Sequence, residues 1–204
     1  MTKIKICGIT NYEDAISASK LGADYIGFNF YRKSPRYIGK QQAKCIILKL
    51  PRKIKKVGVF VNESITRVKD IADFCKLDLI QLSGDENGAY ASKLKKALNK
   101  KLIRSFRVKI KPVFAYVGKY RADYIMLDSF KEGLYGGTGT LFNWKLAKLV
   151  DKNRLFLSGG LNASNIKPAI KKLNPYAVDV CSGIELKPGK KDFKKMKEFI
   201  RAVK

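Results

Sequence analysis

The sequence predicts an α/β fold, a single-domain (β/α)8 barrel of the TIM type, on three observations. Short strand-like runs recur at even intervals along the 204 residues, and most are separated by segments of helical character. No Gly-x-Gly-x-x-Gly motif follows the first run, which argues against an open dinucleotide-binding sheet. Polar residues follow the apolar runs along the whole chain, and closing the strands into a barrel would bring them to one face.

Eight segments are expected to form the strands, because each is a short apolar run bounded by turn residues. They are residues 4–8, 25–30, 56–61, 79–82, 103–108, 124–128, 155–158 and 177–182. This leaves about 25 residues per unit, close to the minimum for a strand, a helix and two turns. No linker or change in composition interrupts the series, so residues 1–204 are expected to form one domain.

The connecting segments are expected to be helical. The run from Thr10 to Glu13 is typical of a capping box that opens a helix through about Leu21, and Gly22 would end it. Similar segments follow at residues 41–50, 64–75, 88–98, 144–152, 163–173 and 191–203, with a shorter one at 112–118.

The composition excludes several classes of mechanism, because the chain contains no His. A Ser-His-Asp or Cys-His nucleophile and an imidazole-ligated metal are therefore ruled out. Any acid or base must be a carboxyl, a thiol, a Lys or a Tyr. The four Cys are scattered without a Cys-x-x-Cys pair, so neither a disulfide framework nor a zinc ribbon is indicated.

The chain is strongly basic, with 43 Lys and Arg against 17 Asp and Glu and a formal net charge of +26. Such an excess raises the possibility of nucleic-acid binding. Most of the bases are Lys spread along the chain, however, which favours a solvated surface over a nucleic-acid partner. The apolar runs are only strand-length and no secretory signal is evident, so we expect a cytoplasmic protein without a membrane partner.

Two residues at strand ends are candidates for proton transfer. Cys7 ends the first predicted strand; a Cys there is usually a small buried apolar residue, but active sites of barrels are built at this end. Its thiolate would accept a proton if its pKa were lowered. Asp128 ends the sixth strand, where helix capping is the alternative role. In a barrel it would face Cys7 across the mouth, and one acid opposite one base suits a proton-transfer reaction.

Three glycine-rich turns after late strands could bind a phosphate through backbone N–H groups. They are Gly136-Gly137-Thr138-Gly139, Ser158-Gly159-Gly160 and Ser182-Gly183. Arg36 lies in the loop after the second strand. It is either a solvated loop cation or a clamp for a carboxylate or phosphate of the substrate.

With these segments in view, the chain resembles the phosphoribosylanthranilate isomerases, (β/α)8 enzymes of the tryptophan pathway. The matching motifs lie in order over nearly the whole chain: residues 5–10 (KICGIT), 22–28 (GADYIGF), 34–38 (SPRYI), 57–61 (VGVFV), 81–86 (QLSGDE), 136–139 (GGTG), 157–161 (LSGGL), 182–185 (SGIE) and 188–192 (PGKKD).

The resemblance implies an Amadori rearrangement of N-(5-phosphoribosyl)anthranilate, with no metal or organic cofactor. The family's general acid falls on Asp128 and its general base on Cys7. Arg36 would bind the anthranilate carboxylate. The phosphate would be held by backbone amides of the three glycine turns, at Gly137, at Gly159 and Gly160, and at Ser182 and Gly183.

Three positions depart from the family pattern. Ser83 stands where His is usual, Asn143 replaces an Asp, and Cys181 occupies a position where Ser is common. None of them removes the proposed acid, base or carboxylate clamp.

Three alternatives remain open at this point. One is a related phosphosugar isomerase of histidine biosynthesis, whose chemistry is associated with two Asp, so that Cys7 argues against it. Another is a polyanion-binding basic protein, and the third is a noncatalytic barrel scaffold. The partner expected from the resemblance is a small phosphorylated molecule, and the protein would be a monomer or a homodimer.

Overall fold

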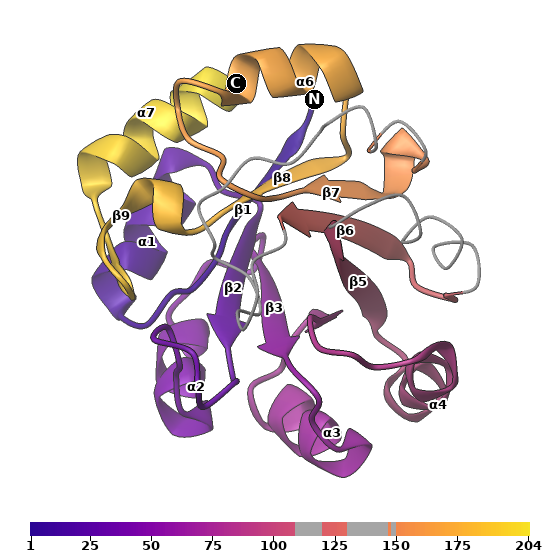
Figure 1. Cartoon of the computed structure of the whole chain (residues 1–204). Coiled ribbons are helices and arrows are strands. Elements are labelled where there is room, and N and C mark those ends of the chain that lie inside the picture. The colour runs from indigo at the N-terminus through magenta and orange to yellow at the C-terminus, as the bar shows by residue number, and fades with distance from the viewer. Residues whose placement is uncertain (109–119, 130–146, 148–149) are drawn as a thin grey trace.

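The computed structural model describes residues 1–108, 120–129, 147 and 150–204. Its centre is a closed barrel of eight parallel strands in which each strand pairs with the next and β8 pairs with β1 (Figure 1). The strands are β1 (Lys3–Ile6), β2 (Tyr25–Asn29), β3 (Lys55–Phe60), β4 (Leu79–Leu82), β5 (Lys101–Val108), β6 (Tyr124–Ser129), β7 (Leu155–Leu157) and β8 (Ala177–Val180). The predicted barrel is confirmed.

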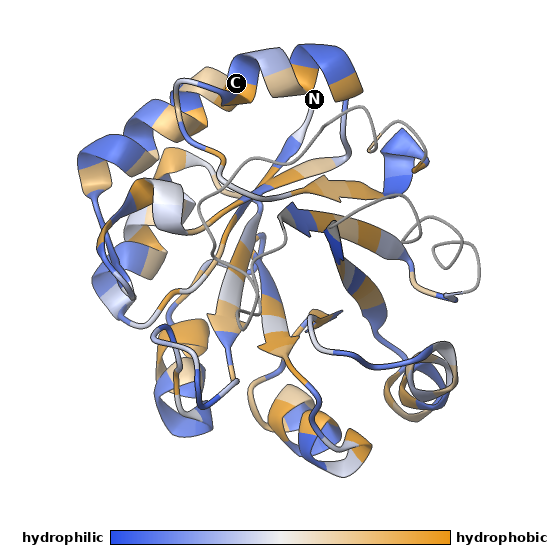
Figure 2. Ribbon diagram, in the orientation of Figure 1, coloured by the Kyte–Doolittle hydropathy of each residue, from blue (hydrophilic) through white to orange (hydrophobic). Residues whose placement is uncertain are grey.

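Helices surround the barrel and pack one face against it. They are α1 (Tyr12–Leu21), α2 (Lys40–Leu48), α3 (Ile65–Phe74), α4 (Gly88–Leu98), α6 (Ile166–Leu173) and α7 (Phe193–Val203), with short 3-10 turns η2 (Lys152–Arg154) and η3 (Ser182–Ile184). Figure 2 shows hydrophobic residues along most of the strands, whereas the helices alternate between hydrophobic and hydrophilic positions. The predicted helix at 112–118 lies outside the described residues, as does most of the one at 144–152.

The first helix begins one residue later than the predicted capping box requires. Its N-cap is Asn11, whose side chain accepts a hydrogen bond from the backbone N–H of Asp14 at 2.9 Å and donates to the Asp14 carboxylate at 2.8 Å. Thr10 instead donates its hydroxyl to the Gly189 carbonyl at 2.5 Å. The box assigned to Thr10 and Glu13 was therefore wrong, because Thr10 is used in a long-range contact.

One element was missed by the sequence analysis. Strands β9 (Glu185–Lys187) and β10 (Lys190–Lys191) form a small antiparallel hairpin beyond β8. Pro188 and Gly189 make its turn, with Gly189 at φ +82°. The last helix consequently begins at Phe193, after Asp192 caps it by accepting from the N–H of Lys195.

The barrel interior changes from apolar to polar along the strands. At the amino end, Tyr25, Val57, Leu79, Ile103 and their neighbours form an apolar cluster that fills the barrel. Successive side chains of a strand point to opposite faces, so residues two positions further along each strand also point into the barrel. At this level most of the inward side chains are polar. Those inward residues are Gln81, Ser105, Asp128, Ser158 and Asp179. The carboxyl ends of the strands therefore surround a polar cavity above a closed apolar floor.

None of the helices in the described ranges is long and apolar enough to cross a membrane.

Candidate active site

A cavity of about 360 Å³ opens at the carboxyl ends of the barrel strands. Seven of the eight residues predicted as site residues line it, although they come from segments far apart in the sequence: Cys7, Arg36, Asp128, Gly159, Gly160, Ser182 and Gly183. The eighth, Gly137, lies outside the described residues, as does the rest of its glycine-rich turn. The closed barrel explains this convergence, because every strand ends at the same rim.

Cys7 follows β1 directly and belongs to the barrel wall. Its backbone N–H donates to the Val180 carbonyl at 3.0 Å, which continues the pairing of β1 with β8. Burial raises the pKa of the Cys7 thiol, and the nearby Lys5 ammonium opposes this effect only in part. The lowered pKa that would favour a thiolate base is therefore not present in the free protein.

A buried ion pair lies beside Cys7 and was not foreseen. Lys5 is fully buried and its Nζ contacts the Asp179 carboxylate at 2.8 Å, because the two residues are register partners in β1 and β8. Gly27 in β2 leaves the space for this arrangement. A Cβ at Gly27 would lie 2.8 Å from the Cys7 Sγ and 3.2 Å from the Lys5 Nζ. The alternation of β1 placed Lys5 and Cys7 on one face, which was the signal available in the sequence.

Asp128 lies within β6, one residue before its end, and only 7% of its surface is exposed. Two strands, β7 and β8, separate β6 from β1 around the barrel, so Asp128 and Cys7 approach the cavity from different parts of its wall. An acid and a base in these positions can reach different atoms of one bound molecule.

Arg36 lies in the loop after β2 and is held by an unforeseen partner, Glu185 of β9. Its Nε donates to the two carboxylate oxygens at 3.0 and 3.1 Å, and its Nη2 donates to one of them at 2.7 Å. Burial alone would lower the pKa of Arg36, but the hydrogen bonds with Glu185 and the electrostatic attraction of Cys181, Glu185 and Cys7 together outweigh it, so the pKa is raised. None of the described residues accepts a hydrogen bond from Nη1, so one edge of the guanidinium is available for an anion.

The glycine turns after β7 and β8 have the open backbone that a phosphate site needs. Gly159 and Gly160 adopt φ values of +90° and +62°, which L residues with a side chain rarely adopt. The Asn165 side chain donates to the Gly160 carbonyl at 2.9 Å and supports this turn. Gly183 lies so close to the Leu161 carbonyl that a Cβ at this position would collide with the carbonyl oxygen. The two loops therefore pack together at the rim.

Further cavity residues were missed because each looks unremarkable in the sequence. Gln81, Ser105 and Arg107 lie on strands β4 and β5 and face the cavity. Gln81 donates to the Ser83 hydroxyl at 3.0 Å, while its Oε1 is buried and accepts no hydrogen bond from any described residue. Ser83 is thus a cavity residue that accepts a hydrogen bond from the Gln81 side chain.

No group of three or more His, Cys, Asp or Glu side chains among the described residues is placed to hold a metal ion. Among those residues, the thiols and carboxyls that line the cavity are those of Cys7, Cys181, Asp128 and Asp179.

Comparison with known proteins agrees with this architecture. The family model described as N-(5'phosphoribosyl)anthranilate (PRA) isomerase matches residues 4–202. Relatives named N-(5'-phosphoribosyl)anthranilate isomerase include one from Aquifex aeolicus, 49% identical over all of this chain and 99% of the relative. Another, from Pelobacter propionicus, is 44% identical over all of this chain and 96% of the relative.

Solved structures extend the similarity to three dimensions. The phosphoribosyl anthranilate isomerase of Thermotoga maritima superposes with a TM-score of 0.88 and 38% identity, covering 100% of this chain and 98% of that one. A second isomerase structure was solved with reduced 1-(o-carboxyphenylamino)-1-deoxyribulose 5-phosphate and superposes with a TM-score of 0.85 at 36% identity, with the same coverage. With a family model that spans nearly the whole chain and relatives above 40% identity, the chain belongs to the N-(5'-phosphoribosyl)anthranilate isomerase family.

Proposed function

We propose that the protein converts N-(5-phosphoribosyl)anthranilate to 1-(2-carboxyphenylamino)-1-deoxyribulose 5-phosphate in tryptophan biosynthesis, and that Cys7 and Asp128 carry out the proton transfers. The observation that supports this assignment most directly is that a thiol and a carboxyl line one cavity together with Arg36 and the glycine turns. The substrate is a small phosphorylated molecule with a carboxylate at its other end, so it requires both kinds of anion site.

Ring opening is the first step. Asp128 donates a proton to the furanose ring oxygen, and the C1′–O bond breaks as the anilino nitrogen forms a protonated imine with C1′. The ring oxygen leaves as the C4′ hydroxyl. A buried carboxylic acid next to the reacting oxygen suits this role because the proton is delivered without bulk water.

Proton abstraction from carbon follows. The Cys7 thiolate takes the proton from C2′, and the electrons of that C–H bond move toward the imine nitrogen to give an enolamine. The enolamine then tautomerises to the C2′ ketone. The positive imine acidifies the C2′–H bond and also favours the thiolate, which offsets the raised pKa of Cys7 in the free protein.

Binding is assigned to the two ends of the cavity. Arg36 takes the anthranilate carboxylate through a charge-assisted hydrogen bond. Backbone amides at Gly159, Gly160, Ser182 and Gly183 take the phosphate, as turns with exposed N–H groups do in other phosphate sites. The cytoplasm is the compartment in which we expect this pathway step, and the protein acts as a monomer or a homodimer.

The assignment is tested by following the loss of the fluorescent anthranilate substrate with purified protein, with and without a metal chelator. We expect turnover that is unaffected by the chelator. Feeding the histidine-pathway aminoaldose in parallel tests the competing isomerase reaction. Turnover of that compound alone would contradict the proposal.

A further inference from the structure

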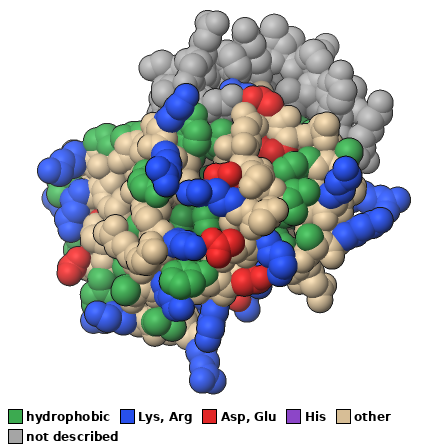
Figure 3. All heavy atoms as spheres, turned by 90° about the horizontal axis from the view of Figure 1, so that it is seen from below, with side chains coloured by type: hydrophobic (Ala, Val, Ile, Leu, Met, Phe, Trp, Pro, Cys, Tyr) green, Lys and Arg blue, Asp and Glu red, His purple; other side chains and the backbone are tan. Residues whose placement is uncertain are grey.

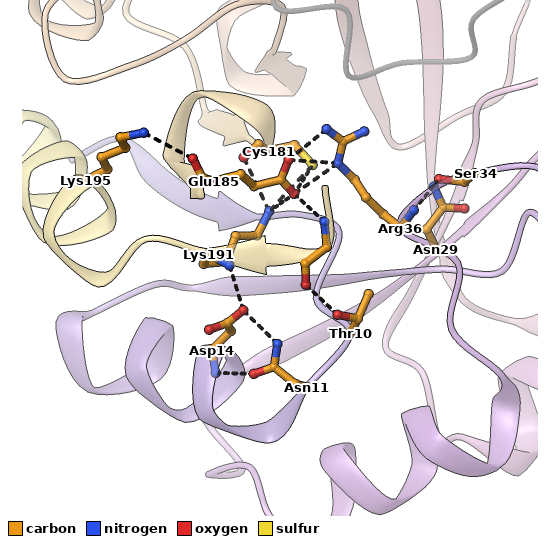
Figure 4. Close-up of polar contacts among 11 residues, drawn as sticks. Thr10, Asn11, Asp14, Asn29, Ser34, Arg36, Cys181, Glu185, Lys191 and Lys195 are labelled. Atoms are coloured by element: carbon orange, nitrogen blue, oxygen red, sulfur yellow. Dashed lines mark hydrogen bonds and ion pairs between the residues drawn. The ribbon is translucent and has the colours of Figure 1, made fainter. Parts of the chain in front are cut away.

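The carboxylate clamp Arg36 belongs to a buried triad of charges. Glu185 lies between Arg36 and Lys191 and accepts from both, with Lys191 Nζ 3.0 Å from its Oε1 (Figure 4). The exposed fractions of the three side chains are 12%, 5% and 0% for Arg36, Glu185 and Lys191. Only Arg36 among the three lines the cavity.

The charges of this triad do not cancel. Burial alone would raise the pKa of Glu185, but hydrogen bonds from Arg36 and the charge of Lys191 hold it below its ordinary value, so the carboxylate stays ionised. A pair of Arg36 and Glu185 alone would be neutral and would give little attraction for an anion. Lys191 adds a second positive charge, so the group of three remains cationic by one unit.

Lys191, in strand β10 of the hairpin, is fixed in place by contacts with Asp14 and Cys181. Its backbone N–H donates to Asp14 at 2.8 Å, and its Nζ also donates to the Cys181 carbonyl at 3.3 Å. The Asp14 carboxylate is itself paired with Lys190 at 3.2 Å, so it does not neutralise Lys191. The β9–β10 hairpin thus delivers a desolvated ammonium behind Glu185, on the side away from the cavity.

We infer that Glu185 and Lys191 are positioning residues for the carboxylate site. Glu185 orients the Arg36 guanidinium by occupying its Nε edge, which leaves Nη1 for the substrate. Lys191 supplies the charge that prevents Glu185 from cancelling the attraction of Arg36 for the anthranilate carboxylate. The inference rests on the proposed function of Arg36.

The test measures the affinity of two ligands by calorimetry. One is reduced 1-(o-carboxyphenylamino)-1-deoxyribulose 5-phosphate, and the other is the same compound without the ring carboxyl. Lys191→Met removes the charge and keeps the chain length. The double variant Lys191→Met/Glu185→Gln removes both charges and restores the net charge beside the cavity. Lys187→Met is the control, because Lys187 is an exposed lysine of the same hairpin.

We expect Lys191→Met to weaken binding of the carboxylate ligand roughly five- to tenfold and binding of the other ligand less than about twofold. KM for the substrate should rise while kcat changes little. The double variant should recover to within about threefold of the wild-type affinity. The control should leave both ligands unchanged.

A purely structural role gives a different result. Equal weakening of both ligands, no weakening of either, or a double variant that binds the carboxylate ligand more weakly than Lys191→Met would each overturn the inference. Thermal unfolding identifies a variant that fails to fold. If Lys191→Met fails to fold, the test relies on the double variant alone. A loss of affinity above about tenfold that is confined to the carboxylate ligand then contradicts the inference. The proposed function is judged separately, by turnover of the wild-type protein.

Discussion

At the residue scale, the environment of the Cys7 thiol combines two opposing effects. Burial disfavours the thiolate, whereas the Lys5 ammonium favours it. Asp179 neutralises Lys5 through their 2.8 Å contact and reduces its influence on the sulfur. The balance leaves the pKa of Cys7 above its ordinary value, and that balance can be measured.

The first prediction concerns the titration of Cys7. The rate of its alkylation by iodoacetamide should rise with pH through a midpoint above that of an ordinary thiol, because thiolate forms only as the pH approaches the raised pKa. Lys5→Met removes the favourable ammonium and should move the midpoint higher still. The measurement is made on a Cys45→Ser background, since Cys45 is exposed.

Cys75 and Cys181 should react slowly in this experiment. Burial raises the pKa of Cys75 to about 11 and that of Cys181 to about 12. Mass spectrometry assigns the modified residue. A midpoint for Cys7 below the ordinary thiol range would show that Lys5 outweighs burial and would contradict the prediction.

The second prediction tests the acid and the base. Cys7→Ser and Asp128→Asn should each reduce kcat by about 10²- to 10⁴-fold, the usual contribution of a positioned acid or base. Both changes are close in size to the original side chain, so the fold and the affinity for the reduced product should be preserved. Near-wild-type turnover in both variants would show that the roles are wrongly assigned.

The third prediction concerns Arg36→Met. Loss of the charge-assisted contact should raise KM by about tenfold or more, with a smaller effect on kcat. The variant also leaves Glu185 with Lys191 as its partner, so no isolated charge is buried. An unchanged KM would rule out Arg36 as the carboxylate clamp.

At the element scale, the ends of the helices depend on a few backbone conformations. Gly22 ends α1 in the left-handed region at φ +103°, and its backbone N–H donates hydrogen bonds to the carbonyls of Ala18 and Ser19. Gly39 begins α2 at φ −71°, in a conformation open to any residue, and a Cβ there would meet no atom within 4 Å. The two glycines therefore differ in what they contribute to folding.

The fourth prediction uses this difference. Gly22→Ala should lower the free energy of unfolding by about 1–2 kcal/mol, because a Cβ strains the left-handed conformation. Gly39→Ala is the matched control and should change it by less than about 0.5 kcal/mol, since the loss of a better cap offsets the gain in chain entropy. Denaturant titration compares them, and equal effects would contradict the assignment of strain to Gly22.

At the scale of the whole molecule, the net charge of +26 does not by itself indicate a binding site for nucleic acid. Figure 3 shows Lys and Arg side chains scattered over the face it displays, among acidic and hydrophobic ones, rather than gathered in one continuous patch. A general positive potential nevertheless attracts small anions, and the proposed substrate has two anionic groups.

The fifth prediction follows from that potential. Raising the salt concentration from about 20 to about 500 mM should lower kcat/KM several-fold, because long-range attraction is screened, while kcat changes little. Duplex and single-stranded nucleic acid should show no sub-micromolar binding at about 150 mM salt. Tight, salt-dependent binding of nucleic acid would contradict this prediction and would favour the polyanion-binding alternative.

The order and type of the elements could be predicted from the sequence, because each strand and helix is specified by its local periodicity and by turn residues at its ends. Observed strand bounds differ from the expected ones by at most two residues. The positions of Cys7 and Asp128 at strand ends, and of Arg36 in the loop after β2, followed in the same way. The β9–β10 hairpin did not, because two strands of two or three residues have no periodic signal.

Only the tertiary structure decided how these residues are paired. Lys5 meets Asp179, and Arg36 meets Glu185, across separations in sequence that no local pattern encodes. Lys191 pairs with the same Glu185 from the neighbouring strand of the hairpin. Strand alternation placed Lys5 and Cys7 on one face, but the register of β1 against β8 determined which carboxylate lies beside them. The physical reason is that burial and charge pairing depend on neighbours in space. The sequence by itself determined the barrel and the chemical groups at its rim, and barrel closure determined their ionisation and their contacts.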